Sequence, residues 1–250
     1  MRVVDLNHTS ASKTIGKIDT LLLPVGTLEA HGPHCSVATD TIIPQKLVED
    51  VDRMAKDRVL IAPAIPYGHT WRLKDRAGSL DVSRKVLADY VFEVIKGFGE
   101  SWKIKYVVIV NGHGGNIEAL HEAAERAEVL GIRTVVLSWW VGGFLDVLHK
   151  VAKDAEGHAG EAETSLVMHA GEQYVDKSLI PAEAPAHSRK TVATLGDIFD
   201  SGSTHAFYPQ PYSGNPRAAT LEKGRVLNEM LAKEILRVAD QLRSENALIA

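Results

Sequence analysis

Four short runs of apolar residues alternate along the chain with longer segments in which apolar positions recur every three or four residues. Runs of this length without charged interruptions are suited to strands that are buried on both faces of a sheet. They cover residues 20–25, 59–62, 106–110 and 134–140. The run over 106–110 is nearly all β-branched, and we therefore expect it to be a central, parallel strand.

The longer segments have the apolar spacing of amphipathic helices. They predict helices over 44–54, 84–98, 117–130, 160–174 and 218–242. In the segment 84–98 we expect the whole apolar stripe to face the core. Its members are Val86, Leu87, Tyr90, Val91, Val94, Ile95 and Phe98. Residues 1–18 are expected to form a peripheral lead-in, and residues 141–154 a short helix or a lid.

The predicted strands and helices alternate in the order that gives parallel strands joined by helical crossovers. This order predicts an α/β fold with a mainly parallel central sheet covered on both faces. The 250 residues fit one domain, 1–250, and a hydrophobic content of 45% is enough for its core. Residues 177–211 lack periodicity, and such a long irregular segment in a compact domain is often functional or lies at an interface.

Groups suited to metal binding follow the first predicted strand. Glu29 and His31 are two positions apart, so their side chains project to the same side of an extended chain. Asp40 lies where the next helix is expected to begin. Carboxylate oxygens and imidazole nitrogens at the end of a buried strand suit a divalent ion such as zinc or manganese.

Two further clusters have the same composition and similar positions. His113 lies in a glycine-rich loop, 111–116, directly after the predicted central strand, and His158 and Glu163 lie in the segment 157–165, at the start of a predicted helix. Three such clusters at strand ends or helix starts of one domain are difficult to explain as solvated surface. Together they indicate a metal site.

At these residues the chain resembles the creatininase (creatinine amidohydrolase) family. The matching blocks are LPVGTLEAHGPH with TDT, then VNGHGGN, GHAGEAETS and SGNPRAAT. The resemblance covers most of the chain, and the first three blocks together are specific. It implies a three-layer α/β/α sandwich, a hydrolytic site with two divalent metal ions per chain (Zn, Mn or Fe) and a ring-like homo-hexamer.

The resemblance also implies roles for individual residues. Glu29, His31, Asp40 and His113 match metal ligands of the family. Asp40 is the natural bridge, because one carboxylate has two oxygens and can hold two ions. Glu29 and His113 would then complete one ion, and His31 the other. His158 matches the family's catalytic histidine, which takes a proton and delivers it to the leaving nitrogen.

The chain departs from creatininase proper at two places. Creatininase has a tyrosine and a metal-binding glutamate directly after the motif histidine, whereas this chain has Gly114 and Gly115. We expect Glu163 to substitute as the missing ligand; the alternative is a carboxylate that supports the ligands or caps the helix. Creatininase also has a tryptophan four residues before the third-block histidine, where this chain has Asp154. Both differences argue against creatinine as the substrate.

Candidate substrate-binding residues lie in two loops at the carboxyl ends of predicted strands, where ligands bind in α/β sheets. They are Tyr67, His69, Gly115 and Asn116. His69 has an equally good interpretation as a loop histidine bonded to the backbone. The glycines after His113 let the backbone approach a ligand closely, and their spacing matches neither nucleotide-phosphate motif. Trp139 and Trp140 could be core residues, or one of them a wall of the substrate cleft.

The favoured function is a two-metal hydrolase that cleaves a C–N bond in a small amide, cyclic amide or formamide. The same site could serve a C–C ring-opening hydrolase of a cyclic polyol ketone of the inosose type, or a peptide-trimming hydrolase. The alternative outside the enzymes is a metal-binding or nucleotide-binding module that catalyses no reaction.

Composition also bears on which partners and which cell compartment we expect. The net charge of −4 and the scattered charges predict no nucleic-acid surface.

The single cysteine, Cys35, excludes an internal disulfide framework and fits a reducing cytoplasm; we interpret it as a small loop residue rather than a ligand. The N-terminus lacks the apolar core of a signal peptide, and no apolar run approaches the roughly 20 residues that span a bilayer. We therefore expect a cytoplasmic enzyme with a small-molecule substrate.

Overall fold

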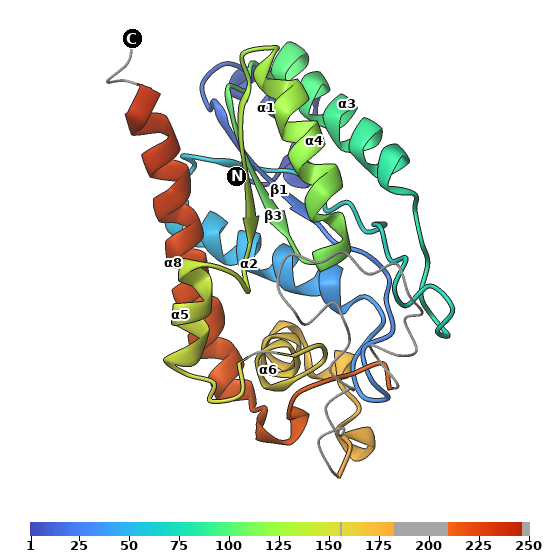
Figure 1. The fold of residues 1–250 in the computed structure, drawn as a ribbon. Coiled ribbons are helices and arrows are strands. Elements are labelled where there is room, and N and C mark those ends of the chain that lie inside the picture. Colours follow the sequence, from blue (N-terminus) through green and yellow to red (C-terminus); the bar gives the residue numbers. More distant parts are fainter. Residues whose placement is uncertain (156, 183–209, 247–250) are drawn as a thin grey trace.

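The centre of the computed structural model, which describes residues 1–155, 157–182 and 210–246, is a sheet of four parallel strands (Figure 1). The strands are β1 (Thr20–Val25), β2 (Leu60–Ile61), β3 (Tyr106–Asn111) and β4 (Arg133–Ser138). They lie in the order β2-β1-β3-β4, and each neighbouring pair is parallel. The predictions of a parallel sheet and of a central strand at 106–110 are therefore confirmed.

The two central strands, β1 and β3, are buried along their whole length. Alternate side chains enter two different cores: Leu22 and Val108 join one, whereas Leu21 and Val107 join the other. A strand covered on both faces has no solvent side, which explains why its apolar run is not interrupted by polar residues.

Helices α3 (Arg84–Trp102) and α4 (Ile117–Glu128) cover one face of the sheet (Figure 1). Leu87, Val91 and Ile95, spaced by four residues, are fully buried in this layer. The predicted stripe was too wide, because Val86 is 57% exposed and Tyr90 is 55% exposed. Each of these two residues precedes a buried position by one, and a step of one residue rotates a side chain by about 100° away from the sheet.

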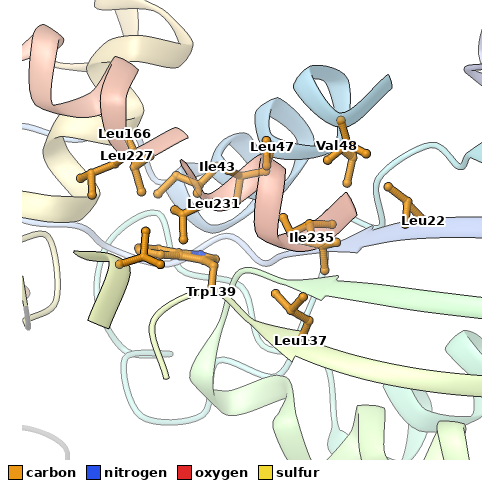
Figure 2. Close-up of a cluster of buried hydrophobic side chains, with 14 of the residues drawn as sticks. Leu22, Ile43, Leu47, Val48, Leu137, Trp139, Leu166, Leu227, Leu231 and Ile235 are labelled. Carbon is orange, nitrogen blue, oxygen red and sulfur yellow. The ribbon is translucent and has the colours of Figure 1, made fainter. Parts of the chain in front are cut away.

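The other face is covered by α2 (Thr39–Ala55) and α8 (Leu221–Asn246), with α5 (Gly143–His149) and α6 (Glu161–Ala170) beside them. Figure 2 shows leucine and isoleucine side chains of these helices packed over Trp139, which is almost fully buried. The three-layer α/β/α arrangement is thereby confirmed, and Trp139 belongs to this core as well as to the cleft described below.

Several predicted boundaries differ from the structure. The helix predicted over 160–174 ends at Ala170, and a 3₁₀ turn over Glu172–Tyr174 follows Gly171. The strand predicted over 59–62 pairs only over Leu60–Ile61. The lead-in contains a short helix, α1 (His8–Thr14), and the segment 141–154 contains α5. Most of the irregular segment predicted over 177–211 lies outside the described residues, since these omit 183–209.

Within the described part of the chain, none of the helices combines the length and the apolar character needed to cross a bilayer.

The beginning of α2 lies unusually close to the residues that follow β3. A Cβ atom on Gly112 would lie 1.9 Å from the backbone oxygen of Asp40, so only glycine fits at this position. The absence of a side chain at Gly112 thus lets the first turn of α2 approach the end of β3. This contact brings Asp40 next to His113.

Candidate metal centre and active site

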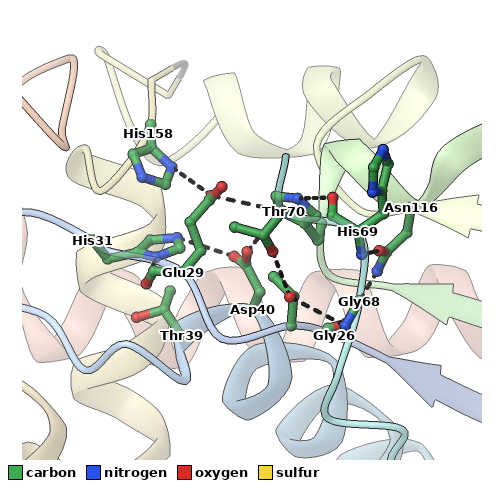
Figure 3. Close-up of polar contacts among 12 residues, drawn as sticks. Gly26, Glu29, His31, Thr39, Asp40, Gly68, His69, Thr70, Asn116 and His158 are labelled. Atoms are coloured by element: carbon green, nitrogen blue, oxygen red, sulfur yellow. Dashed lines mark hydrogen bonds and ion pairs between the residues drawn. The ribbon is translucent and has the colours of Figure 1, made fainter. Parts of the chain in front are cut away.

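Asp40 lies at the centre of a group of buried polar side chains, in the first turn of α2. Its Oδ1 is 3.0 Å from Nε2 of His31, and its Oδ2 is 2.8 Å from Nδ1 of His113. Figure 3 shows Glu29, His31 and His158 around this carboxylate. The two oxygens of one carboxylate therefore face two different imidazoles.

The backbone determines which nitrogen of each imidazole faces the carboxylate. Nδ1 of His31 lies 2.9 Å from the carbonyl oxygen of Glu29, and Nε2 of His113 lies 3.1 Å from that of His69. A carbonyl oxygen can only accept, so both of these nitrogens donate. In its neutral form each ring then directs a lone pair at Asp40. Metal-binding histidines are oriented in the same way, with the second nitrogen donating to a carbonyl or carboxylate.

A lone pair directed at a carboxylate is unfavourable unless a proton or a cation lies between them. While both rings are neutral, Nε2 of His31 and Oδ2 of Asp40 are buried without a hydrogen-bond partner among the described residues, which costs free energy in a buried site. The site therefore attracts positive charge at both oxygens of Asp40.

The pKa values of the metal-free protein reflect this attraction. Burial alone would lower the pKa of His31, but Asp40, Glu163 and Glu29 raise it to about 10. Burial also opposes the rise at His113, where Glu29 and Asp40 raise the pKa to about 9. Burial would raise the pKa of Asp40, yet the two histidines hold it well below its usual range.

Two glutamates complete the group. Oε2 of Glu29, in the loop after β1, is 3.5 Å from Nδ1 of His113. Oε2 of Glu163, in the first turn of α6, is 3.6 Å from Nε2 of His31. Burial raises the pKa of both carboxyl groups, that of Glu163 to about 7. A divalent ion would offset the cost of burying these charges together.

These side chains form three groups that could hold a metal ion. In each group the ligand atoms lie within 4.8 Å of one another among the described residues. The groups are Glu29, Asp40 and His113; His31, Asp40 and Glu163; and Glu29, His31 and His158. The first two share Asp40. Mixed imidazole and carboxylate ligands fit zinc and manganese.

His158 lies just before α6 and is oriented by the first loop. Its Nε2 donates to the carbonyl oxygen of Ala30 at 2.8 Å, which leaves the lone pair of the neutral ring on Nδ1, 3.8 Å from Oε2 of Glu29. The ring centroid is 4.1 Å from that of His31. Burial lowers the pKa of His158 to about 3, so the ring is neutral at physiological pH. A neutral imidazole in this position can accept a proton on Nδ1.

The group opens into a cleft of about 1340 Å³. Of the predicted substrate-binding residues, His69 and Gly115 line this cleft. Tyr67 is 50% exposed and is not among the lining residues, and Asn116 is fully buried. The remaining wall contains aromatic, aliphatic and basic side chains, together with the acidic Asp81 and Glu118. They include Trp71, Arg72, Leu73, Lys74, Arg84, Trp139, Trp140 and Leu145.

The side chain of Asn116 supports the loop that contains His69 instead of facing the cleft. Its side-chain oxygen accepts the backbone N–H of His69 at 2.8 Å, and its nitrogen donates to the carbonyl oxygen of Gly26 at 3.1 Å. The loop it holds supplies the carbonyl oxygen that orients His113. Asn116 therefore acts on the site through His69.

Gly115 has no room for a side chain. A Cβ atom there would lie 2.0 Å from the carbonyl oxygen of His69 and 2.6 Å from Nε2 of His113. With this backbone, a ligand cannot come from position 115, where creatininase has its glutamate. Besides Asp40, the carboxylate of Glu163 lies near Nε2 of His31, at 3.6 Å.

Other candidates from the motif blocks have different surroundings. Glu161 is buried against Lys223 and accepts the backbone N–H of Asp154, so it lies outside the three ligand groups. Cys35 is buried with its Sγ 3.6 Å from Oγ1 of Thr164, and burial raises the pKa of its thiol to about 12. The thiol is therefore protonated at physiological pH, as expected of a small packing residue.

The sequence did not indicate the basic side chains of the cleft, Arg72, Lys74 and Arg84, or Ser213. Single charges in an irregular loop carry no periodic signal. Ser213 belongs to the SGNPRAAT block, but its place in the cleft depends on a contact between residues far apart in the sequence. The backbone N–H of His158 donates to Oγ of Ser213 at 2.8 Å.

A sequence model of the family described as creatinine amidohydrolase matches residues 5–239. The chain is 28% identical over 246 residues to a mycofactocin precursor peptide peptidase of Mycobacterium ulcerans (strain Agy99), which covers 94% of this chain and 90% of that protein. It is 30% identical over 159 residues to a 3-dehydro-scyllo-inosose hydrolase of Thermotoga maritima, which covers 59% of this chain and 49% of that protein.

A solved structure described as "Creatininase Mn" has a TM-score of 0.78 and 22% sequence identity, and the match covers 98% of both chains. This likeness shows a shared fold. Because the family model spans nearly the whole chain, the protein belongs to the creatininase (creatinine amidohydrolase) family of hydrolases.

Proposed function

We propose that the protein is a hydrolase in which two divalent ions (zinc, manganese or iron) activate water to cleave a C–N bond. Glu29, Asp40 and His113 would hold one ion, and His31, Asp40 and Glu163 the other. The observation that carries this proposal is the pair of imidazole nitrogens that face the two oxygens of the buried Asp40 carboxylate. Such an arrangement supports one carboxylate shared by two ions.

When bound, such ions would supply Lewis-acid chemistry: they would lower the pKa of a water and polarise the carbonyl that is attacked. His158 supplies the proton transfer: its neutral ring takes a proton on Nδ1 and then delivers it to the leaving nitrogen. His69 and Gly115 line the cleft beside His113, and we assign them contacts to the substrate. Tyr67 and Asn116 are not assigned such contacts, for the reasons given above.

The bond cleaved is, in this proposal, the C–N bond of an amide, cyclic amide or formamide. An amide at the end of a peptide is included, because the cleft of about 1340 Å³ is larger than the roughly 300–1,000 Å³ usual for small-molecule sites. The similarity to the peptidase covers 94% of the chain, which also supports a peptide amide. The similarity to the inosose hydrolase covers less of the chain, and C–C cleavage is therefore the second candidate.

Elemental analysis of protein grown with ample zinc and manganese should find two ions per chain. Asp40→Asn should lower the content of both ions, whereas His31→Ala should mainly empty one. Equal losses in the two variants would remove Asp40 from the shared position. A wild-type protein that contains no metal, and takes up none on titration, would end the two-metal proposal.

The substrate is identified by a screen of formamides, lactams, short peptides and inososes with the metal-loaded enzyme. We expect C–N cleavage, abolished by a chelator and restored by added metal. We expect negligible turnover of creatinine, because Gly114, Gly115 and Asp154 stand where creatininase has other residues. Turnover of an inosose alone would replace the proposed reaction with C–C cleavage.

We also propose a homo-hexamer in the cytoplasm that acts on a soluble substrate without nucleic-acid or membrane partners. The exposed apolar side chains of Val86 and Tyr90 on α3, and of Val129 and Leu130 after α4, support burial against another copy. Light scattering coupled to size-exclusion chromatography tests the assembly, and cell fractionation tests the location.

A further inference from the structure

Ala159, between His158 and α6, has a backbone conformation that alanine seldom adopts. Its φ is +50°, in the left-handed region, and its side chain is fully buried. In this region the Cβ atom of an L-residue crowds the following carbonyl oxygen, so a non-glycine residue must be held there by its surroundings.

The first turn of α6 holds Ala159 on both sides of its Cα atom. The backbone N–H of Ala159 donates to Oε2 of Glu163 at 2.6 Å, and its carbonyl oxygen accepts the hydroxyl of Thr164 at 3.2 Å. The N–H belongs to the peptide group shared with His158, and the carbonyl to the next peptide group. The two bonds together therefore determine both backbone angles of Ala159.

Thr164 is in turn held by a residue of the first motif loop. Nε2 of His34 lies 3.0 Å from Oγ1 of Thr164, and both side chains are buried. Because the hydroxyl hydrogen of Thr164 is directed at a carbonyl oxygen, His34 must be the donor in this contact. Neither residue lines the cleft. A chain of hydrogen bonds thus runs from His34 through Thr164 to the backbone of Ala159.

We propose that Thr164, backed by His34, is a positioning residue: its hydroxyl keeps Ala159 in the left-handed conformation, which aims the Ala159 N–H at Glu163 and holds that carboxylate toward His31. This inference rests on the proposed function, in which Glu163 and His31 share an ion. Without the hydroxyl, Ala159 relaxes to negative φ, its N–H turns away, and Glu163 loses the bond that orients it.

The consequence is specific to one of the two ions. The ion assigned to His31, Asp40 and Glu163 should be held more weakly, whereas the ion assigned to Glu29, Asp40 and His113 should be affected less. Loss of a group that orients a metal ligand typically weakens metal affinity about 10- to 100-fold.

The test compares Thr164→Val, which replaces the hydroxyl by a methyl group, with Thr164→Ser, which keeps it. Zinc affinity is measured by competition with a chromophoric chelator on metal-depleted protein, together with kcat and KM of the loaded enzyme. We expect Thr164→Val to bind the ion assigned to His31, Asp40 and Glu163 at least about tenfold less tightly than the wild type does, with kcat reduced and KM little changed. Thr164→Ser should stay within about threefold of the wild type. If the valine variant does not fold, Thr164→Ala against Thr164→Ser makes the same comparison of the hydroxyl.

A second substitution separates positioning from a general loss of stability. Glycine adopts positive φ without strain, so Ala159→Gly combined with Thr164→Val should recover most of the lost zinc affinity. A merely structural Thr164 would instead give a double variant at least as weak as the single one. Wild-type affinity in Thr164→Val, or no recovery in the double variant, overturns the inference. Failure of the wild type to bind two ions overturns the proposed function instead, before any variant is compared.

Discussion

At the scale of single residues, the chemistry of the site depends on which nitrogen of each histidine is already occupied. His31, His113 and His158 each donate one ring N–H to a backbone carbonyl oxygen, at 2.9, 3.1 and 2.8 Å respectively. The backbone thereby selects the tautomer and directs the other nitrogen at Glu29 or Asp40. Substitutions that disturb these carbonyl contacts should therefore affect metal binding without touching a ligand.

Gly115→Ala tests this dependence. The added Cβ would displace the carbonyl oxygen of His69, which lies 2.0 Å from its position, and the hydrogen bond to His113 would be lost. We expect zinc affinity to fall about 10- to 100-fold, measured by chelator competition. Gly114→Ala is the matched control, because no other atom of the described residues lies within 4 Å of a Cβ at that position. Equal effects of the two substitutions would contradict the role of the His69 contact.

His158→Ala tests the proton shuttle. Since His158 is assigned to proton transfer rather than to metal binding, its loss should leave metal content and folding nearly unchanged and lower kcat about 10²-fold or more. The loss should be smaller for substrates with good leaving groups. Glu163→Ala should differ by lowering the occupancy of one ion along with the rate. If His158→Ala loses metal and Glu163→Ala keeps it, the two assignments must be exchanged, so that His158 is the metal ligand and Glu163 transfers the proton.

At the scale of elements, two helices deliver carboxylates from their first turns. Asp40 lies in the first turn of α2 and Glu163 in that of α6, and the positive end of a helix dipole favours negative charge there. Both helices are anchored in the same core by α8, whose Leu231 and Ile235 are fully buried. The positions of the two carboxylates therefore depend on how α8 packs.

Leu231→Ala should destabilise the protein by about 2–5 kcal/mol, because it removes buried apolar volume between α8 and its neighbours. Leu221→Ala in the same helix is the control: Leu221 is 44% exposed, and its replacement should change the free energy of unfolding by less than about 0.5 kcal/mol. Urea unfolding of metal-free protein measures both. Similar values for the two variants would contradict the packing described here.

At the scale of the whole molecule, metal binding, protonation and stability are linked. In the metal-free fold the pKa values of His31 and His113 are about 10 and 9, against an ordinary value of 6.5. Raised histidine pKa values mean that the folded state retains protons that the unfolded chain has lost. Their stabilisation is complete below pH 6.5 and is lost as pH rises to between 9 and 10.

The melting temperature of metal-free protein should therefore fall as pH is raised from about 6.5 to 9.5. Zinc must displace the same protons, so its affinity, and the increase in melting temperature that it causes, should grow over this range. Thermal unfolding at several pH values with and without zinc measures both trends. Asp40→Asn should flatten the pH dependence of the metal-free protein, because Asp40 is the main cause of the raised pKa of His31. A melting temperature that rises with pH in metal-free wild type would contradict this linkage.

The apolar pattern was sufficient for the strands and for the order of the layers, because burial on both faces leaves a continuous run such as Thr20–Val25. It failed at Val86 and Tyr90, which continue the stripe of α3 but face away from the sheet. Periodicity records where apolar residues are, and the packing of neighbouring helices determines how wide a stripe is covered.

The sequence by itself determined the kinds of candidate ligand and their places at strand ends and helix starts, because these follow from local patterns and motifs. Only the tertiary structure decided which atoms meet: that His31 and His113 face different oxygens of Asp40, and that Asn116 holds a loop rather than lining the cleft. The hydrogen bond between His34 and Thr164 joins residues 130 positions apart. Contacts of this kind depend on how separate segments pack around one sheet, and no local pattern contains that information.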